Sequence, residues 1–198
     1  MSIGLWVRGA RPKTLVTSIA SVMVGAVMAY VHIERSGTCI AIYPEPASCA
    51  TAREQQTLLM DRFWPVTILC LLVALFLQIA VNYANDYSDG IRGTDAGRDM
   101  DESKSGKPQR LTASGLVPAK HVLFAAMICA AIACICGVVA VVLAQAWWLL
   151  AVGAASLLAG WFYTGGKHPY GYVGLGEVGV FLFFGLAAVL GPEYALCG

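Results

Sequence analysis

The sequence predicts an all-α fold, a polytopic membrane helix bundle with five transmembrane helices. Hydrophobic residues make up 58% of the 198-residue chain and charged residues only 13%, whereas a soluble domain carries about 25% charged residues. Mostly apolar, uncharged stretches also recur at about 20 residues, the length at which a helix crosses a bilayer. We therefore expect the lipid bilayer to surround the chain. The net charge of +1 gives no sign of a nucleic-acid partner, and we expect none.

The five predicted helices cover residues 15–33, 63–84, 121–144, 146–163 and 175–191. The first could instead be a cleaved signal peptide. Its apolar run exceeds the roughly 7–15 residues of such a segment, however, and no small-x-small cleavage site follows, so we expect a retained helix. Only residues 144–146 separate the third helix from the fourth, which predicts a tight antiparallel hairpin. The Ala and Gly content of these two helices lets their backbones approach closely in lipid.

The distribution of Lys and Arg predicts the orientation of the bundle. Ten of these residues lie in the N-terminal segment, in the inner loop 85–120 and after the fourth helix, against three in the outer loop 34–62. Since cytoplasmic loops carry the excess of basic residues, the N-terminus and the loop 85–120 are expected in the cytoplasm, beneath a plasma membrane. The outer loop is expected to be a connector, in which Cys39 and Cys49 either form a disulfide or stay free.

A polar stripe begins inside the second predicted helix. Gln78, Asn82, Asp86 and Asp89 recur at steps of four, four and three residues, which places them on one helix face. Lipid penalises such a face, so the stripe must meet a wet cavity or other helices, and it is a functional candidate by default. A charged loop can also be a plain solvated connector, an interpretation that suits residues 98–107 better than residues 82–89.

The acidic residues at the end of the stripe predict a Mg²⁺ site. Crowded carboxylates repel each other unless a cation lies between them, and Mg²⁺ favours one or two carboxylates together with substrate phosphates. The predicted metal ligands are Asp86, Asp89 and Asp95, and the catalytic candidates are Asn82, Asn85, Asp86 and Asp89. Neighbouring basic side chains can bind the phosphate charge, namely Arg92, Lys104, Lys107 and Arg110. Such a site suits an amphiphile with a diphosphate head and an apolar tail.

At these residues the sequence resembles the UbiA superfamily of intramembrane prenyltransferases. The family's first aspartate motif appears here as Asn85-Asp86-Tyr-Ser-Asp89, followed by Asp95. Three further stretches, residues 11–15, 108–115 and 162–177, are similar to the branch of 1,4-dihydroxy-2-naphthoate polyprenyltransferases of menaquinone synthesis. The resemblance covers most of the chain except the outer loop.

The resemblance implies a Mg²⁺-dependent transfer of a polyprenyl group from polyprenyl diphosphate to 1,4-dihydroxy-2-naphthoate, in which the acceptor loses its carboxylate and demethylmenaquinone forms. The family has about nine helices and a second aspartate motif, whereas this chain stops at Gly198. Residues 1–198 would then be a partial transmembrane prenyltransferase domain, either a natural truncation, a fragment or one part of a split protein, and we expect it to be inactive or nearly so alone.

Aromatic and basic residues near the same membrane face have two interpretations each. Tyr83, Tyr87, Trp161 and Tyr163 either stabilise a cationic prenyl fragment or form an interfacial belt. Arg11 and Lys13 either approach the site or only set topology, and Lys167, His168 and Tyr170 are candidates to meet the acceptor.

Two other classes of protein stay open at this point. A cation or metabolite transporter would need further ionisable residues at mid-bilayer, and only Gln78 and Glu177 lie near there. A non-catalytic membrane fragment would leave the intramembrane polar stripe without a purpose. The sequence specifies neither the prenyl chain length nor the oligomeric state.

Overall fold

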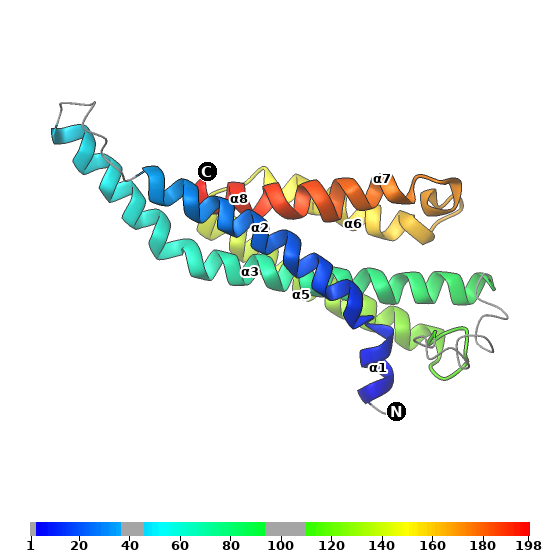
Figure 1. Cartoon of the computed structure of the whole chain (residues 1–198). Coiled ribbons are helices and arrows are strands. Elements are labelled where there is room, and N and C mark those ends of the chain that lie inside the picture. Colours follow the sequence, from blue (N-terminus) through cyan, green and yellow to red (C-terminus); the bar gives the residue numbers. More distant parts are fainter. Residues whose placement is uncertain (1–2, 37–45, 94–109) are drawn as a thin grey trace.

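The computed structural model describes residues 3–36, 46–93 and 110–198, with side chains from residue 50 onward in the second range. All regular secondary structure in these ranges is helical, which confirms the predicted fold class (Figure 1). The helices are α1 (Ile3–Gly9), α2 (Pro12–Ser36), α3 (Pro46–Arg92), α5 (Ala119–Ala144) and α6 (Leu149–Thr164). A 3₁₀ turn, η1 (Tyr170–Val173), then precedes a last helix made of α7 (Gly176–Val180), the π-helical η2 (Phe181–Ala187) and α8 (Ala188–Cys197).

Four of these helices are long and apolar enough to cross a membrane, so the chain is a multi-pass membrane protein. They cover Pro12–Ser36, Ala50–Arg92, Ala119–Ala144 and Gly176–Cys197. The fourth predicted helix, 146–163, is α6, and its 16 residues rise only about 24 Å at 1.5 Å per residue. The hydrocarbon core of a bilayer is about 30 Å thick, so α6 is shorter than the transmembrane helix predicted there. Residues 144–148 form the predicted tight hairpin turn between α5 and α6.

Helix α3 is much longer than the predicted helix 63–84. It runs unbroken over 47 residues from Pro46 to Arg92, so the predicted loops 34–62 and 85–120 are helical in part, and those boundaries are wrong. An apolar run marks the part of a helix that lipid surrounds and does not mark where the helix ends. The residues before the membrane include the good helix formers Ala, Glu, Gln and Leu. Helix α3 stops at Gly93, whose φ of 71° suits a left-handed C-terminal residue.

Helices α2 and α8 approach each other closely at Gly25. A Cβ atom on Gly25 would lie 2.2 Å from the backbone oxygen of Val189. One turn earlier, Ser21 Oγ donates a hydrogen bond to the backbone oxygen of Phe184 at 2.9 Å. This contact fits the use of small residues where transmembrane helices touch.

Replacing Gly25 with Ala is therefore expected to push α2 away from α8 and destabilise the chain by about 1–3 kcal/mol. Thermal unfolding in detergent micelles measures the change. Gly191→Ala is the matched control, because a Cβ at Gly191 meets nothing within 4 Å. Equal unfolding temperatures for the two variants would contradict the close packing.

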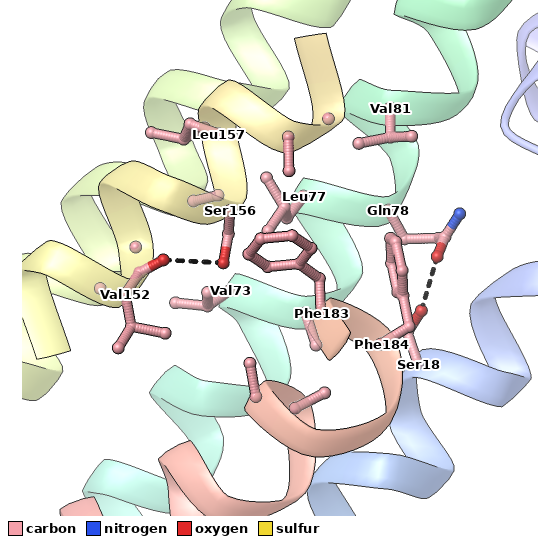
Figure 2. Close-up of a pocket in the computed structure, with 18 of the residues that line it drawn as sticks. Ser18, Val73, Leu77, Gln78, Val81, Val152, Ser156, Leu157, Phe183 and Phe184 are labelled. Atoms are coloured by element: carbon pink, nitrogen blue, oxygen red, sulfur yellow. Dashed lines mark hydrogen bonds between the residues drawn. The ribbon is translucent and has the colours of Figure 1, made fainter. Parts of the chain in front are cut away.

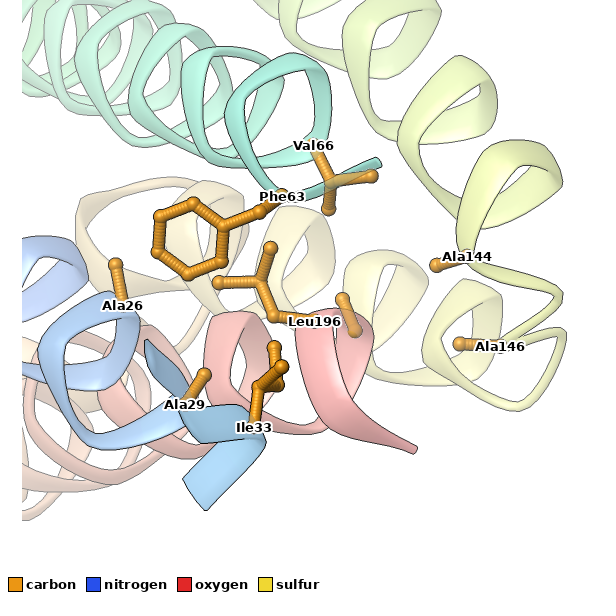
Figure 3. Packing of buried hydrophobic residues seen from close by; sticks show 9 residues of the cluster. Ala26, Ala29, Ile33, Phe63, Val66, Ala144, Ala146 and Leu196 are labelled. Atoms are coloured by element: carbon orange, nitrogen blue, oxygen red, sulfur yellow. The ribbon is translucent and has the colours of Figure 1, made fainter. Parts of the chain in front are cut away.

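Two clusters of buried side chains hold opposite ends of the bundle together. One joins α2, α3, the α5–α6 turn and α8, and its largest members are Ile33, Phe63, Val66 and Leu196 (Figure 3). The other joins the N-terminal segment, the end of α3 and the start of α5 to residues 110–117, with Leu111 fully buried. The second cluster fixes the segment that follows the aspartate motif against the end of α3.

Candidate active site

Three of the four residues of the polar stripe of α3 are buried within the bundle, as predicted, and Asp89 is half-buried. Gln78, Asn82 and Asp86 are at most 9% exposed. Ser18 Oγ donates to Gln78 Oε1 at 2.8 Å, and Gln78 Nε2 donates to Asn82 Oδ1 at 3.2 Å. The chain of hydrogen bonds ends where Asn82 Nδ2 donates to the backbone oxygen of Ala10 at 2.8 Å and to Thr14 Oγ1 at 2.9 Å. Asn82 therefore ties the last third of α3 to the start of α2.

Asp86 binds two backbone amides of the segment that follows the aspartate motif. Its side chain is 1% exposed. One carboxylate oxygen accepts from the N–H of Leu111 and the other from the N–H of Thr112, both at 2.9 Å. These charge-assisted bonds are among the stronger hydrogen bonds in proteins. The contacts give Asp86 a structural role in placing residues 110–112, and its predicted role as a metal ligand stays a prediction.

Asn85 and Asp89 contact the end of α6 and the segment that follows it. Thr164 Oγ1 donates to Asn85 Oδ1 at 2.8 Å, and the hydroxyl of Tyr172 donates to Asp89 Oδ1. One turn further along α3, Arg92 donates to the backbone oxygen of Gly166. Its guanidinium lies 5.8 Å from the centroid of the Tyr172 ring. The end of α3 thus holds the residues 164–172 beside the aspartate motif.

A cavity of about 820 Å³ lies between the helices, within the size range of small-molecule sites. Most of its wall is apolar and comes from α2, α3, α5, α6 and the last helix. Figure 2 shows Phe183 of η2 next to Leu77 of α3, and Phe184 nearer Gln78 and Ser18. The charged lining residues are at one end, where the start of α2 meets the end of α3, namely Arg11, Asp89 and Arg110.

The predicted site residues take different positions around this cavity. Asn82, Asn85, Asp89 and Arg110 line it, whereas Asp86 and Arg92 do not. The predicted metal ligand Asp95 and the predicted phosphate ligands Lys104 and Lys107 lie outside the described residues. The structure therefore brings four of the predicted residues to one polar end, and their catalytic and ligand roles stay predictions.

Arg11 lies in the wall of the cavity, in an unusual conformation. Its φ of 55° is left-handed, which is uncommon for a residue other than glycine, and it separates α1 from α2. Its Nη2 atom is buried, and among the described residues it has no hydrogen-bond partner. A buried guanidinium nitrogen of this kind favours an anion at the same end of the cavity.

The aromatic residues divide between the cavity and the core. Tyr163 and Tyr170 line the cavity, with ring centroids 5.5 Å apart in an edge-on contact. Burial, together with the neighbouring Tyr163, raises the pKa of Tyr170, so its hydroxyl stays protonated at neutral pH. Tyr83 instead packs in the core and donates to the backbone oxygen of Trp6 at 2.9 Å. Thr164 and Tyr172 are site residues that the sequence analysis did not single out.

The sequence matches the UbiA prenyltransferase family over residues 57–195, and the chain belongs to this family. It is 40% identical over 193 residues to a 1,4-dihydroxy-2-naphthoate octaprenyltransferase of Mycobacterium leprae (strain TN), covering 98% of this chain and 54% of the relative. It is 42% identical over 193 residues, with the same coverage, to the protein of that name from Mycobacterium tuberculosis (strain ATCC 25618 / H37Rv). The Escherichia coli (strain K12) protein of that name is 30% identical over 96% of this chain and 52% of its own length.

The chain thus spans about half the length of the curated relatives it matches. No solved structure was found to match it. The resemblance seen in the aspartate motif and the three further stretches is confirmed at the level of the family.

Proposed function

We propose that this chain takes part in the Mg²⁺-dependent transfer of a polyprenyl group from polyprenyl diphosphate to 1,4-dihydroxy-2-naphthoate, which gives demethylmenaquinone in its reduced quinol form. The observation that carries the proposal is the cavity of about 820 Å³, which combines an apolar wall with one charged end. An amphiphile with an anionic head and a hydrocarbon tail matches this cavity, because its head suits the charged end and its tail suits the apolar wall. We take the acceptor, 1,4-dihydroxy-2-naphthoate, from the names of the relatives.

The charged end offers groups of both signs for a diphosphate and its metal. Asp89 provides a carboxylate at the cavity, and Asp86 and Asp95 are the further ligands that the motif predicts. The donor set is all oxygen, which suits Mg²⁺. Bound there, Mg²⁺ would neutralise the charge of the leaving diphosphate. Arg11 and Arg110 lie in the same wall and can bind the remaining phosphate oxygens.

The chain's residues position the two reactants for one exchange of bonds. The allylic C–O bond to diphosphate breaks, a carbon of the naphthoate ring bonds to the allylic carbon, and diphosphate leaves. The acceptor's carboxylate departs as CO₂, and its electron pair returns to the ring. The rings of Tyr163 and Tyr170 border this end of the cavity and can stabilise the developing allylic cation by up to about 2 kcal/mol. The apolar wall keeps water from the cation.

We further infer that the charged end faces the cytoplasm beneath a plasma membrane. The basic residues Arg8, Lys13 and Lys167 flank this end, in the pattern of cytoplasmic loops. The diphosphate would then enter from the aqueous side, and its tail would lie between the helices.

Binding and turnover test the proposal separately. The purified chain in detergent micelles is expected to bind a radiolabelled polyprenyl diphosphate in the presence of Mg²⁺ and to lose most of this binding in EDTA. Membranes that contain the chain, supplied with the naphthoate as well, are analysed for prenylated product by chromatography and mass spectrometry. Absence of Mg²⁺-dependent binding would contradict the proposed site.

Arg11→Gln is expected to weaken binding of the diphosphate about tenfold or more, because a charge-assisted hydrogen bond in a buried site is lost. The readout is the dissociation constant of polyprenyl diphosphate at fixed Mg²⁺. Arg8→Gln is the matched control, since Arg8 is exposed on α1 and does not line the cavity. If both variants bind like the wild type, Arg11 only sets topology.

Gly153→Leu is expected to weaken binding of a long-chain polyprenyl diphosphate about tenfold or more by filling the apolar end of the cavity. Gly153 lines the cavity, and a Cβ there meets nothing within 4 Å. It lies 11 residues before Thr164 on α6, or roughly 16 Å from the polar end.

Dimethylallyl diphosphate, with a tail of one isoprene unit, should bind Gly153→Leu and the wild-type chain equally. Gly4→Leu, an exposed substitution on α1 with open space around it, controls for added bulk. If Gly153→Leu loses the same affinity for the long-chain and the short-chain diphosphate, the tail does not bind beside Gly153.

A further inference from the structure

A second group of chemically reactive side chains lies at the opposite end of the bundle. His32 of α2 and Glu193 and Cys197 of α8 each offer one donor atom, and these atoms all lie within 4.8 Å of one another. Phe63, which packs in the cluster around Ile33 and Leu196, is 19 residues before Asn82 on the continuous helix α3. The two ends are therefore roughly 28 Å apart along that helix.

We propose that His32, Glu193 and Cys197 form a binding site for a divalent transition-metal ion of the Zn²⁺ class. The donor set is one imidazole nitrogen, one carboxylate oxygen and one thiol sulfur. This mixture suits Zn²⁺, whereas Mg²⁺ and Ca²⁺ prefer oxygen alone. The site is separate from the proposed Mg²⁺ site in both place and ligand chemistry.

The distance between two of the ligand atoms is close to that in a tetrahedral site. Cys197 Sγ lies 3.7 Å from Glu193 Oε1. Bond lengths of about 2.3 Å to sulfur and about 2.0 Å to oxygen place two such ligands about 3.5 Å apart at the tetrahedral angle. Glu193 and Cys197 are one helical turn apart, so they share one face of α8. Only His32 has to come from another helix.

The backbones that carry the three ligands are held firmly in place. Ile33, next to His32, and Leu196, next to Cys197, are both fully buried in one cluster (Figure 3). Helices α2 and α8 also meet at Gly25 and Val189. Since the supporting residues are locked by packing, little conformational entropy is lost when the ligands bind a metal.

An open position remains for a fourth ligand. His32 and Glu193 line a second cavity of about 550 Å³, together with Met28 and Arg35. His32 is exposed, and Glu193 and Cys197 are half-buried, so an ion and a water molecule can reach the site. The thiolate and the carboxylate supply two negative charges, which balance those of Zn²⁺.

Metal titration of the purified 198-residue chain tests this proposal. The wild type is expected to bind Zn²⁺ at this site, and His32→Ala and Cys197→Ser are each expected to weaken that binding by at least about tenfold. Co²⁺ in place of Zn²⁺ should give a thiolate-to-cobalt absorption band that Cys197→Ser abolishes. His121→Ala and Cys136→Ser are matched controls on α5 and should change neither result.

Circular dichroism and gel filtration show whether each variant is folded. If Cys197→Ser does not fold, two other measurements test the site. His32→Gln, a change at an exposed position, should weaken Zn²⁺ binding. Zn²⁺ should also protect Cys197 of the wild type from alkylation. No saturable Zn²⁺ binding, or binding that His32 and Cys197 substitutions leave unchanged, would overturn the proposal. Unaltered Mg²⁺-dependent diphosphate binding in these variants is expected, so the two sites are tested independently.

Discussion

Asp89→Asn is expected to lower the Mg²⁺-dependent affinity for polyprenyl diphosphate by about a hundredfold. Asp89 is the carboxylate that lines the cavity among the described residues, and it lies at the same end as Arg11 and Arg110. Asn keeps the size of the side chain but removes the charge that attracts the metal. Isothermal titration with Mg²⁺ held constant measures the loss, and the affinity measured in EDTA should barely change.

A matched substitution separates this effect from a general change of charge. Asp61 is exposed near the other end of α3, so Asp61→Asn should bind the diphosphate like the wild type. Tyr172→Phe removes the hydroxyl that donates to Asp89 and should cause a smaller loss of affinity. If Asp89→Asn binds normally in Mg²⁺, the metal is not at the end of α3.

The polar stripe could be predicted because a helix has a fixed period. Residues spaced by four along an apolar helix must share a face, and the burial of Gln78, Asn82 and Asp86 follows from the cost of exposing them to lipid. The partners of these residues could not be predicted in the same way. Asp86 binds the backbone amides of Leu111 and Thr112, and a backbone amide has no signature in the sequence.

The true length of α3 also could not be predicted from hydropathy. The apolar run predicted a helix over residues 63–84, and the helix continues in both directions through polar residues. Propensity alone is a weak guide there, and the packing of Tyr83 and Leu111 in one cluster helps to hold the last turns. As a result, Asp86 and Asp89 lie on a rigid helix and not in a loop.

Arg11 shows a third limit of the sequence. The proline at position 12 disfavours a right-handed helical conformation at Arg11, which predicts a break between two helices. The direction in which the side chain leaves that break depends on φ, and the left-handed value of 55° directs it into the cavity wall. Either interpretation, topology or site, was therefore consistent with the sequence.

Asp86→Ala is expected to destabilise the chain by roughly 3 kcal/mol or more, because two buried hydrogen bonds to a charged acceptor are lost together. The amides of Leu111 and Thr112 would be left without their acceptor. Asp86→Asn keeps one acceptor oxygen and should cost less. Thermal unfolding in micelles should show the highest unfolding temperature for the wild type, a lower one for Asp86→Asn and the lowest for Asp86→Ala. Hydrogen exchange at residues 111 and 112 should accelerate in both variants.

Substitutions of the two aspartates of the motif should therefore have different effects on binding and stability. Asp89→Asn removes metal-dependent binding from a chain that unfolds at the wild-type temperature, since Asp89 is only half-buried. Asp86→Ala weakens the fold first, and it weakens binding because Arg110, adjacent to the released segment, is no longer held in the cavity wall. Should Asp86→Ala abolish Mg²⁺-dependent binding while stability and exchange at residues 111 and 112 stay unchanged, Asp86 acts as the metal ligand that the motif predicts and not as a structural anchor.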